Sequence, residues 1–342
     1  MIVLDAEAVR ALLPMPESIV LMRQALSTFS AGRLIHPQRG MLRTAAGDAL
    51  AVMPAYVEPS AEVPLAGFGI KLIAIKPGNP DRGLDSHLGM VLVLDDETGL
   101  PRALMDGAAI TAVRTAAVSA VATDLLAGRE ATNLAIIGAG VQARTHLEAM
   151  AEVRDLRMTR VWSRTPGRAA ALAKWAVERS LPCAVEVAPT VASATRDADI
   201  ICTVTASAQP LLDAGDVKPG AHINAVGSSF PDRRELGTEL VAGCAIFVDS
   251  RESALREGGD ICIPIAEGRL APDAIRAEVG EVLLGRSAGR RTPQEITLFK
   301  SLGLAVEDVL AWFAVDVRAR ELGLGTTVRL FPDPAGGEGE SR

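Results

Sequence analysis

The glycine-rich turn Gly138-Ala139-Gly140 is the clearest point in this sequence where residue types and spacing indicate chemistry. An apolar, strand-like run at residues 134–137 leads into it, and a helical pattern follows from Val141 to residue 150. Gly138 permits a tight turn, and Gly140 has no Cβ to keep a pyrophosphate from the backbone. The start of the helix offers unpaired N–H groups to a phosphate. The pattern predicts a dinucleotide-binding site, with an ordinary strand-to-helix turn as the alternative.

The end of the next predicted strand indicates the phosphate state of the cofactor. Enzymes that use NAD usually place Asp or Glu there, where the carboxylate binds the ribose 2′-hydroxyl. This chain instead has Ser163, Arg164 and Thr165, followed by Arg168. Two cations and two hydroxyls suit a 2′-phosphate through charge-assisted hydrogen bonds. The sequence therefore predicts NADPH or NADP, with NADH as a weaker substitute; a basic loop without this role is the alternative.

Lys71 interrupts a strand-like run that is otherwise apolar, at residues 68–75. Because lysine is almost never buried unless it is paired, its ammonium is expected to be buried and paired or to face a cavity. A solvated lysine is the alternative. A charged group inside an apolar strand is a candidate for substrate binding.

Length and composition limit the classes of protein to which the chain can belong. Its 342 residues suffice for two domains, and 49% hydrophobic residues with 3% aromatics suit an α/β protein with buried parallel strands. A net charge of −7 offers no attraction to nucleic acid or to an anionic membrane. The N-terminus has no signal-peptide pattern, and no uncharged run approaches the roughly 20 residues that cross a bilayer.

The cysteines are widely spaced and form no CxxC pair. This spacing is typical of reduced, mostly buried thiols in a cytoplasmic protein, and we expect no metal site. The four residues are Cys183, Cys202, Cys244 and Cys262.

Two kinds of pattern follow each other along the chain. The first part has a helix at residues 16–32, strand-like runs without intervening helices, and a long Ala-rich helix at residues 110–127, which favours an antiparallel sheet. Its strands are expected at residues 49–53, 69–75, 90–94 and 102–105. The second part alternates strands and helices, which is typical of a parallel sheet. Its strands are expected at residues 134–137, 158–162, 200–204, 223–226 and 246–248, with a helix at 167–179 and a last helix at 301–322.

These patterns predict an α/β protein with a Rossmann NAD(P)-binding domain and an α+β substrate domain built on a mainly antiparallel sheet. We assign residues 119–306 to the Rossmann domain and residues 1–118 plus 307–330 to the substrate domain. Residues 331–342, rich in Gly, Pro and Glu, are expected to form a flexible tail.

Several segments together resemble the ornithine cyclodeaminase/mu-crystallin family, in order and over nearly the whole chain. They are residues 52–56 (VMPAY), the strand of Lys71, residues 106–107 (DG), 110–117 (ITAVRTAA), 138–143 (GAGVQA), 218–227 (KPGAHINAVG) and 299–308 (FKSLGLAVED). The resemblance is closest to the mu-crystallin, or ketimine reductase, branch. It implies a Rossmann domain plus an N-terminal domain that dimerises through its sheet, and therefore a homodimer.

The resemblance also implies roles for individual residues. Arg39, Lys71 and Arg114 would bind the α-carboxylate of a substrate, with Lys71 near the reacting carbon–nitrogen bond and Met53 beside them. A planar arginine fork and a lysine point charge both suit a carboxylate. His87 would donate a proton or a hydrogen bond. The cofactor-binding positions would be Thr115, Gly138, Ala139, Gly140, Val141, Gln142, Ser163, Arg164, Thr165, Arg168, Thr203, Val204, Thr205, Val226, Gly227, Ser228, Ser301 and Gly303.

Two of these assignments have alternatives. Without the resemblance, Arg114 in its Ala-rich helix could equally be an exposed surface residue. Arg43 is a rival to Arg39, because the two lie close together in the sequence and the alignment there depends on where a gap is placed.

Two positions depart from the cyclodeaminase pattern. Ser229 stands where cyclodeaminases carry a catalytic Asp, and Ala51 stands where they carry a Glu. Deaminating and cyclising ornithine requires a group that manages protons on two amines. A hydroxyl and a methyl cannot replace two carboxylates. Carboxylate binding and hydride transfer remain possible.

The sequence therefore predicts an NADP-dependent reductase that acts on imines of α-keto acids. Cyclic ketimine carboxylates are the first choice of substrate, and reductive amination of a small keto acid, as by alanine dehydrogenase, and iminosuccinate reduction are close alternatives. A cyclodeaminase-type ammonia lyase and a non-catalytic, crystallin-like protein that binds NADPH or a small ligand are the rival functions. The presence of Lys71 and Arg114 argues against loss of catalysis.

Overall fold

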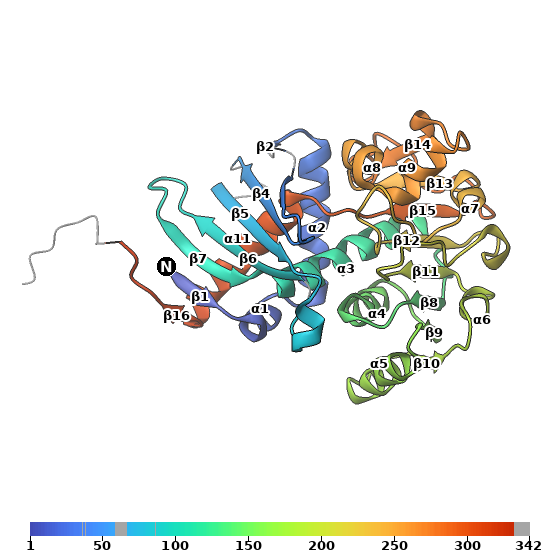
Figure 1. Cartoon of the computed structure of the whole chain (residues 1–342), viewed down its shortest axis with the longest axis horizontal. Helices are drawn as coiled ribbons and strands as arrows, with labels where there is room; N and C mark the ends of the chain where they lie inside the picture. Colours follow the sequence, from blue (N-terminus) through green and yellow to red (C-terminus); the bar gives the residue numbers. More distant parts are fainter. Residues whose placement is uncertain (36, 38, 59–66, 86, 332–342) are drawn as a thin grey trace, which may run out of the picture.

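The computed structural model contains two sheets with helices between and around them (Figure 1). It describes residues 1–331 except 36, 38, 59–66 and 86. Within these residues each sheet has eight strands. Most of the predicted tail, residues 332–342, lies outside the described residues, so its flexibility stays a prediction.

The first sheet joins strands from the N-terminal part of the chain to one strand near its C-terminal end. The order is β16-β1-β7-β6-β5-β4-β2, and β3 pairs with β4. Neighbours are antiparallel except β1 and β7, so the predicted, mainly antiparallel sheet is confirmed. The strands are β1 (Ile2–Leu4), β2 (Leu34–Ile35), β3 (Gly40–Arg43), β4 (Ala49–Val57), β5 (Gly67–Ile75), β6 (His87–Leu94), β7 (Pro101–Asp106) and β16 (Thr326–Thr327).

Strand β4 is longer than the sequence indicated. It continues through Pro54 to Val57, whereas the predicted strand ended at Met53. In the described pairing, β4 meets β3 at residues 49–52 and β2 at residues 56–57, which leaves an open edge between them. An open edge tolerates a residue without an N–H group, so Pro54 does not end the strand.

Helix α3 (Gly107–Leu126) lies between the two sheets and joins their cores. It begins three residues before the predicted start, because the Asp106 carboxylate accepts from the N–H of Ala109 at 2.7 Å and caps it. By length and composition alone α3 is apolar enough to cross a membrane, but 83% of that stretch is buried inside the protein. It is the central core helix of the molecule.

Helix α11 (Ala305–Leu322) packs on the buried face of the first sheet, so its chain returns to the N-terminal part as predicted. The predicted start at residue 301 is wrong, because Gly303 has a φ of 83°, a left-handed conformation that interrupts a helix. A Cβ on Gly69 would lie 2.3 Å from the ring of Trp312, so this glycine admits the helix to β5. Lys71 lies two residues after Gly69 on the same face of β5, and Asp308 lies about one turn before Trp312 in α11. The contact between Gly69 and Trp312 therefore brings Lys71 and Asp308 together.

The remaining helices of the N-terminal part are short or amphipathic. Helix α2 contacts α3, and its residues Ile19, Met22 and Leu26 are buried. The helices of the N-terminal part besides α3 are α1 (Ala6–Leu12), α2 (Met15–Ser30) and the 3-10 turn η1 (Asn79–Arg82).

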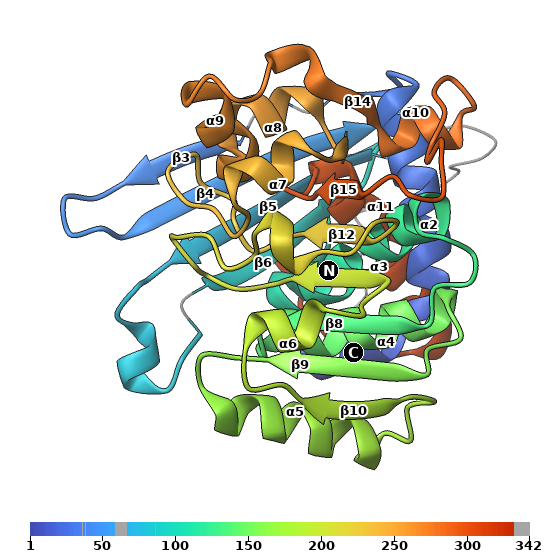
Figure 2. The same ribbon diagram turned by 90° about the vertical axis from the view of Figure 1, so that its right-hand side faces the viewer.

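The second sheet is fully parallel, with the order β10-β9-β8-β11-β12-β15-β13-β14 (Figure 2). The five predicted strands are present, and the predictions missed β10, β14 and β15. The strands are β8 (Asn133–Ile137), β9 (Met158–Trp162), β10 (Ala184–Val187), β11 (Ile200–Thr203), β12 (His222–Ala225), β13 (Ala245–Val248), β14 (Ile275–Glu278) and β15 (Thr297–Lys300).

Helices cover both faces of this parallel sheet, as the alternating pattern predicted. Helices α3, α4 and α5 bury one face in the core shared with the first sheet, and a second core lies on the other face. The helices are α4 (Val141–Val153), α5 (Pro166–Glu178), α6 (Val191–Thr195), α7 (Thr238–Ala242), α8 (Arg251–Glu257), α9 (Gly259–Ala266) and α10 (Val279–Leu283), with η2 (Ala214–Asp216) and η3 (Pro272–Ala274). The proposed domain boundaries at 118/119 and 306/307 fall within α3 and α11.

All four cysteines are free thiols, as expected. Cys202 is buried, as predicted, and the other three are intermediate in exposure.

Candidate active site

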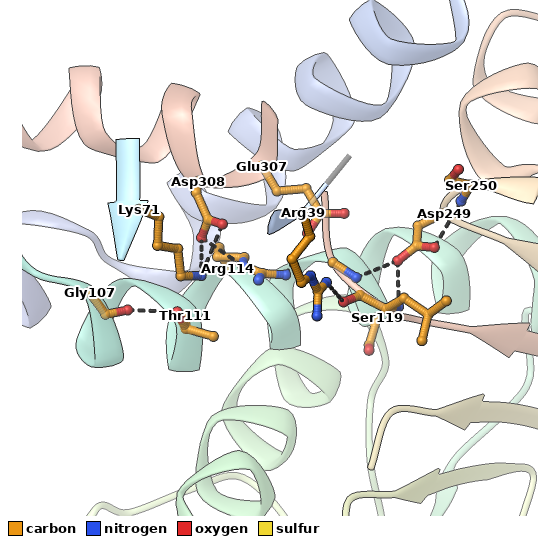
Figure 3. Close-up of polar contacts among 12 residues, drawn as sticks. Arg39, Lys71, Gly107, Thr111, Arg114, Ser119, Asp249, Ser250, Glu307 and Asp308 are labelled. Atoms are coloured by element: carbon orange, nitrogen blue, oxygen red, sulfur yellow. Dashed lines mark hydrogen bonds and ion pairs between the residues drawn. The ribbon is translucent and has the colours of Figure 1, made fainter. Parts of the chain in front are cut away.

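Lys71, Arg114 and Asp308 meet where the first sheet contacts α3 and α11 (Figure 3). The Lys71 ammonium donates to both carboxylate oxygens of Asp308 at 2.9 Å. The Nε of Arg114 donates to the same carboxylate at 3.0 Å. Lys71 is 1% exposed and Arg114 is 5% exposed, which rules out a solvated lysine and a surface arginine. The fold thus brings together two cations that the sequence analysis assigned to one site.

The shared carboxylate supports the charge of both cations. Burial lowers the pKa of Lys71 to about 8, although Asp308 acts in the opposite direction. Burial alone would raise the pKa of Asp308, but Arg114 and Lys71 hold it below its usual value. Burial also disfavours charge on Arg114, yet Asp308 and Glu307 raise its pKa. At neutral pH all three groups are therefore charged, and Lys71 is the one closest to titration.

Glu307 contacts the same arginine from the first turn of α11. Its Oε2 accepts from Nη1 of Arg114 at 2.6 Å, while its buried Oε1 has no hydrogen-bond partner among the described residues. Burial raises the pKa of Glu307 to about 8, against the attraction of Arg114, so this carboxyl mostly keeps its proton at neutral pH. Lys71, Arg114, Glu307 and Asp308, here called the substrate cluster, then have a net positive charge. Such a site suits an incoming carboxylate.

Arg39 approaches this cluster from the segment before β3. Its Nη2 donates to the carbonyl oxygen of Leu302 at 3.4 Å, Nη1 lies 3.7 Å from Glu257, and its buried Nε has no described partner. Its rival Arg43 is exposed, and its guanidinium lies 5.7 Å from the ring centre of Phe230. The geometry favours Arg39 as the third cation.

The neighbouring strand places two further residues on the same buried face. Met53 lies directly opposite Lys71 in the pairing of β4 with β5, and Ala51 lies two residues away on the same face. A carboxylate at position 51 would project toward the substrate cluster, and this chain has a methyl group there. His87 begins β6, but its side chain lies outside the described part of the structure, so its role stays a prediction.

The predicted cofactor residues follow the carboxyl ends of five adjacent strands, β9-β8-β11-β12-β15. The direction of winding reverses between β8 and β11, which is where open α/β sheets bind ligands. Residues 163–168 follow β9, and residues 138–142 follow β8. Thr203 is the last residue of β11, and residues 204 and 205 follow it. Residues 226–228 follow β12, and Ser301 and Gly303 follow β15. Thr115 lies beside Arg114 on α3 and is 7% exposed.

The glycine turn fits a bound pyrophosphate. Gly138 has a φ of 127°, and a Cβ there would lie 2.8 Å from the carbonyl oxygen of Val204, so the position requires glycine. A Cβ on Gly140 would meet nothing within 4 Å among the described residues, so space is open before the helix. No described side chain caps α4, which leaves its first N–H groups available to an anion.

The residues after β9 are arranged as a short polar loop. Thr165 donates its N–H to the Oγ of Ser163 at 3.3 Å. Arg164 and Arg168 are exposed, and neither forms an ion pair with a described residue. Both guanidinium groups are thus free to bind a phosphate.

The segment after β15 connects the cofactor edge to the substrate cluster. The buried Asp249 carboxylate accepts from the N–H groups of Leu302 and Gly303 at 2.5 and 2.7 Å. A Cβ on Gly303 would lie 2.5 Å from Nη1 of Arg114, so this glycine leaves room for the guanidinium. Ser301 has a buried hydroxyl without a described partner.

The sequence analysis missed the acidic residues of the site. Glu307 and Asp308 are 0% exposed although they are acidic and adjacent, and Asp249 is buried as well. The available signal was a pair of carboxylates at the start of a mainly apolar helix. That pattern is also typical of exposed first-turn residues that complement the helix dipole, so it does not reveal burial.

One cavity borders this region without including its cations. A space of about 660 Å³ is lined by the corner of α1 and α2, by Ala112 and Val113 of α3, and by α4 and α5. The predicted cofactor residue Val141 lines it, but neither Lys71 nor Arg114 does. We place the active site by the converging charges instead. Among the described residues no group of His, Cys, Asp and Glu is arranged to hold a metal ion.

Known proteins match this chain over most of its length. A family model, ornithine cyclodeaminase/mu-crystallin family, matches residues 1–322. The ketimine reductase mu-crystallin of Mus musculus is 42% identical over 291 residues, covering 84% of this chain and 87% of that protein.

Two solved structures share the fold. Thermococcus litoralis Δ1-pyrroline-2-carboxylate reductase in complex with NADH and L-proline has a TM-score of 0.91 and 36% identity, covering 96% of this chain and 100% of that one. An archaeal alanine dehydrogenase dimer with bound NAD has a TM-score of 0.89 and 29% identity, covering 97% and 99%. The predicted combination of a Rossmann-type parallel sheet and a mainly antiparallel sheet is confirmed.

Proposed function

The chain belongs to the ornithine cyclodeaminase/mu-crystallin family, and we propose that it is an NADPH-dependent reductase of imines of α-keto acids. Its substrate class is a cyclic ketimine carboxylate, which it reduces to a cyclic amino acid. The observation that carries the proposal is the net positive substrate cluster beside the cofactor edge. The related enzymes are oxidoreductases that act on imines or amino acids, and this chain has the same class of activity.

The three cations bind and orient the substrate. Arg114 and Lys71 hold its α-carboxylate, and Arg39 closes the site from the other side. Asp308 fixes both cations, so little reorganisation is needed when the substrate arrives. Reduced nicotinamide, when bound, supplies the hydride that the imine carbon accepts.

The imine nitrogen needs a proton as the carbon is reduced. Lys71, with a pKa lowered to about 8 by burial, is mostly protonated at neutral pH and close to its titration point. A group with such a pKa is well suited to proton transfer. Its Nζ therefore holds a proton beside the carbon–nitrogen bond in this proposal.

NADPH is the proposed cofactor because of the loop after β9. Arg164 and Arg168 have no ion-pair partner in the described chain, and Ser163 and Thr165 add two hydroxyls. The Thermococcus litoralis enzyme has NADH bound, and the archaeal alanine dehydrogenase has NAD. We therefore propose a preference for NADPH for this chain, whereas these two solved structures have NADH or NAD bound.

The rival functions lack support from the site. Ala51 and Ser229 supply no carboxylate where a cyclodeaminase needs one. A binding protein without turnover would not need an ionisable group close to its titration point in the site, and Lys71 is such a group.

An NADPH-consumption panel tests the proposal. We expect NADPH oxidation with Δ1-pyrroline-2-carboxylate and Δ1-piperideine-2-carboxylate, and weaker oxidation with pyruvate, glyoxylate or oxaloacetate plus ammonia or methylamine. Ornithine with NAD(P)⁺ should release neither proline nor ammonia. NADPH fluorescence changes without consumption would support the binding protein, and proline from ornithine at a comparable rate would support the cyclodeaminase.

We also propose a homodimer formed through the outward face of the first sheet. This face is unusually apolar for an exposed surface, with Leu50 36%, Phe68 53%, Leu88 45% and Met90 50% exposed. The alanine dehydrogenase relative is a dimer. Phe68→Asp should convert the dimer to a monomer in light scattering after size exclusion, and a wild-type monomer would contradict the proposal.

A further inference from the structure

A buried carboxylate beneath the cofactor edge joins the loops after β11 and β12. The Oε1 of Glu235 accepts from the N–H and the hydroxyl of Thr205, each at 2.7 Å. Its Oε2 accepts from the hydroxyl of Thr203 and the N–H of Gly227, each at 2.8 Å. All four lone-pair positions of one carboxylate are therefore occupied by donors from two neighbouring strand ends.

Glu235 is itself held by a buried ion pair. The Oδ1 of Asp260 accepts from the N–H groups of Glu235 and Leu236 at 2.8 and 3.0 Å. The Oδ2 of Asp260 lies 3.0 Å from the ammonium of Lys300, the last residue of β15. Glu235, Asp260 and Lys300, here called the support cluster, are each 0% exposed. The cluster thus connects the ends of β11, β12 and β15.

The loops are packed so tightly that their geometry depends on this carboxylate. A Cβ on Gly227 would lie 2.0 Å from the carbonyl oxygen of Thr205 and 2.5 Å from Oε1 of Glu235. The Thr203 hydroxyl is buried, so it serves Glu235 and not a ligand. This refines the prediction that Thr203 binds the cofactor directly.

We infer that Glu235 is a positioning residue for the nicotinamide half of the cofactor, and the inference rests on the proposed nicotinamide-dependent function. It acts through the backbone at Thr205 and Gly227, which lie at the carboxyl ends of strands beside the winding reversal, where such ligands bind. Burial raises the pKa of Glu235, and Asp260 raises it further. A proton on either oxygen can be donated to the threonine hydroxyl beside it, so the N–H groups of Thr205 and Gly227 keep their acceptors in either protonation state of Glu235.

Glu235→Gln is the direct test, because it preserves shape. A threonine hydroxyl can rotate to accept from the new amide, but a backbone N–H cannot. In either orientation, the N–H of Thr205 or of Gly227 loses its acceptor. The dissociation constant for NADPH, measured by its fluorescence without any imine present, should rise about tenfold or more. The fold-decrease in kcat at saturating NADPH should be smaller than the fold-increase in the KM for NADPH.

Asp316→Asn is the matched control. Asp316 is an equally buried carboxylate in α11 that pairs with Arg102 at 2.8 Å and with Arg320 at 2.9 Å, away from the cofactor edge. It should lower the urea midpoint as Glu235→Gln does, with less than a twofold change in NADPH affinity. Equal weakening of NADPH binding by both variants would overturn the inference, as would wild-type affinity in Glu235→Gln.

Thr203→Val serves if Glu235→Gln does not fold. It removes one donor to Glu235 from a position that the cofactor cannot reach, so NADPH affinity should fall severalfold; unchanged affinity would overturn the inference. Wild-type protein that binds NADH and not NADPH would contradict only the cofactor preference, and the comparison would then use NADH. If wild-type protein binds either cofactor but none of the imines causes its oxidation, the proposed reaction is contradicted. The effect of Glu235 on cofactor binding would still stand.

Discussion

The molecule contains two buried ionic clusters that differ in their contacts with the backbone and in their balance of charge. In the support cluster, each oxygen of Glu235 accepts two hydrogen bonds. In the substrate cluster, one oxygen of Glu307 has no partner among the described residues, and the nearby Nε of Arg39 has none either. The support cluster contains two carboxyl groups and one cation, and its Asp260 Oδ2, 3.0 Å from the Lys300 ammonium, also has no described hydrogen-bond partner. The substrate cluster has a net positive charge at neutral pH.

We interpret this difference as a structural role for the support cluster and a proposed binding role for the substrate cluster. Both clusters bury charge, which costs free energy unless the groups are paired. The support cluster accepts hydrogen bonds from the backbone N–H groups of residues 205, 227, 235 and 236, and it therefore fixes the chain. The substrate cluster leaves positive charge and bonding positions unused, as a site for an anionic ligand requires.

The largest effect is expected when a substrate cation is removed. Lys71→Ala should lower kcat/KM for a cyclic ketimine on the order of 10³-fold, because it removes a charged partner of the carboxylate and a proton beside the nitrogen. NADPH affinity should stay close to normal, since the cofactor edge is intact. Lys76→Ala, at an exposed lysine, is the control. A folded Lys71→Ala enzyme that keeps most of its kcat would show that Lys71 is structural.

Asp308→Asn should have the next largest effect, with a loss in kcat/KM on the order of a hundredfold. The amide no longer attracts Lys71, so the pKa of Lys71 should fall further below about 8. The alkaline limb of the pH–rate profile should therefore move to lower pH. Asp260→Asn in the support cluster should lower stability and leave that limb in place; an equal movement in both variants would remove the distinction between the clusters.

Ligand affinity should also depend on pH in a direction set by the substrate cluster. The Lys71 pKa is lowered to about 8 and the Glu307 pKa is raised to about 8 by burial. As pH rises through 8, Lys71 loses positive charge and Glu307 gains negative charge, and both changes disfavour a bound carboxylate. Affinity for pyrrole-2-carboxylate, whose carboxylate stays ionised here, should fall up to about tenfold per pH unit per proton. Constant affinity from pH 6.5 to 9 would contradict these assignments.

The smallest effect is expected at the distal end of the cofactor, where neither cluster is touched. Arg164→Ala should raise the KM for NADPH about fivefold to tenfold, since it removes one charge-assisted contact to the 2′-phosphate. The KM for NADH should be nearly unchanged in the same protein. An equal rise in the KM for NADPH and for NADH would mean that Arg164 stabilises the loop and does not bind the 2′-phosphate.

Much of the parallel half was predictable because its signals are local. The run before Gly138, the glycine turn and the helix that follows are encoded within about twenty consecutive residues, and the structure has β8, the turn and α4 there. Strands β10, β14 and β15 were missed because each includes a charged residue that interrupts its apolar run, whereas the equally short β11, β12 and β13 contain no Asp, Glu, Lys or Arg. The insertion of β15 between β12 and β13 is a long-range pairing that no local pattern encodes.

The candidate site was predictable on one side only. A lysine inside an apolar strand conflicts with burial, and that conflict marked Lys71. Asp308 supplies the charged partner that buried Lys71 needs. It lies 237 residues away along the chain, in a helix whose starting point was predicted wrongly. Because a carboxylate in a first helical turn is usually exposed, its type and position gave no sign of burial.

The sequence by itself determined the parts that depend on neighbouring residues: the nucleotide-binding turn, the basic loop after β9, the uncharged positions 51 and 229, and the family. Tertiary structure alone decided which charges meet. Glycine at position 69 lets Trp312 approach β5, and this contact sets Asp308 against Lys71 and Arg114. Glu235 joins two strand ends in the same way. Pairing of this kind depends on how elements dock, and docking is set by the whole buried surface, not by any local run of residues.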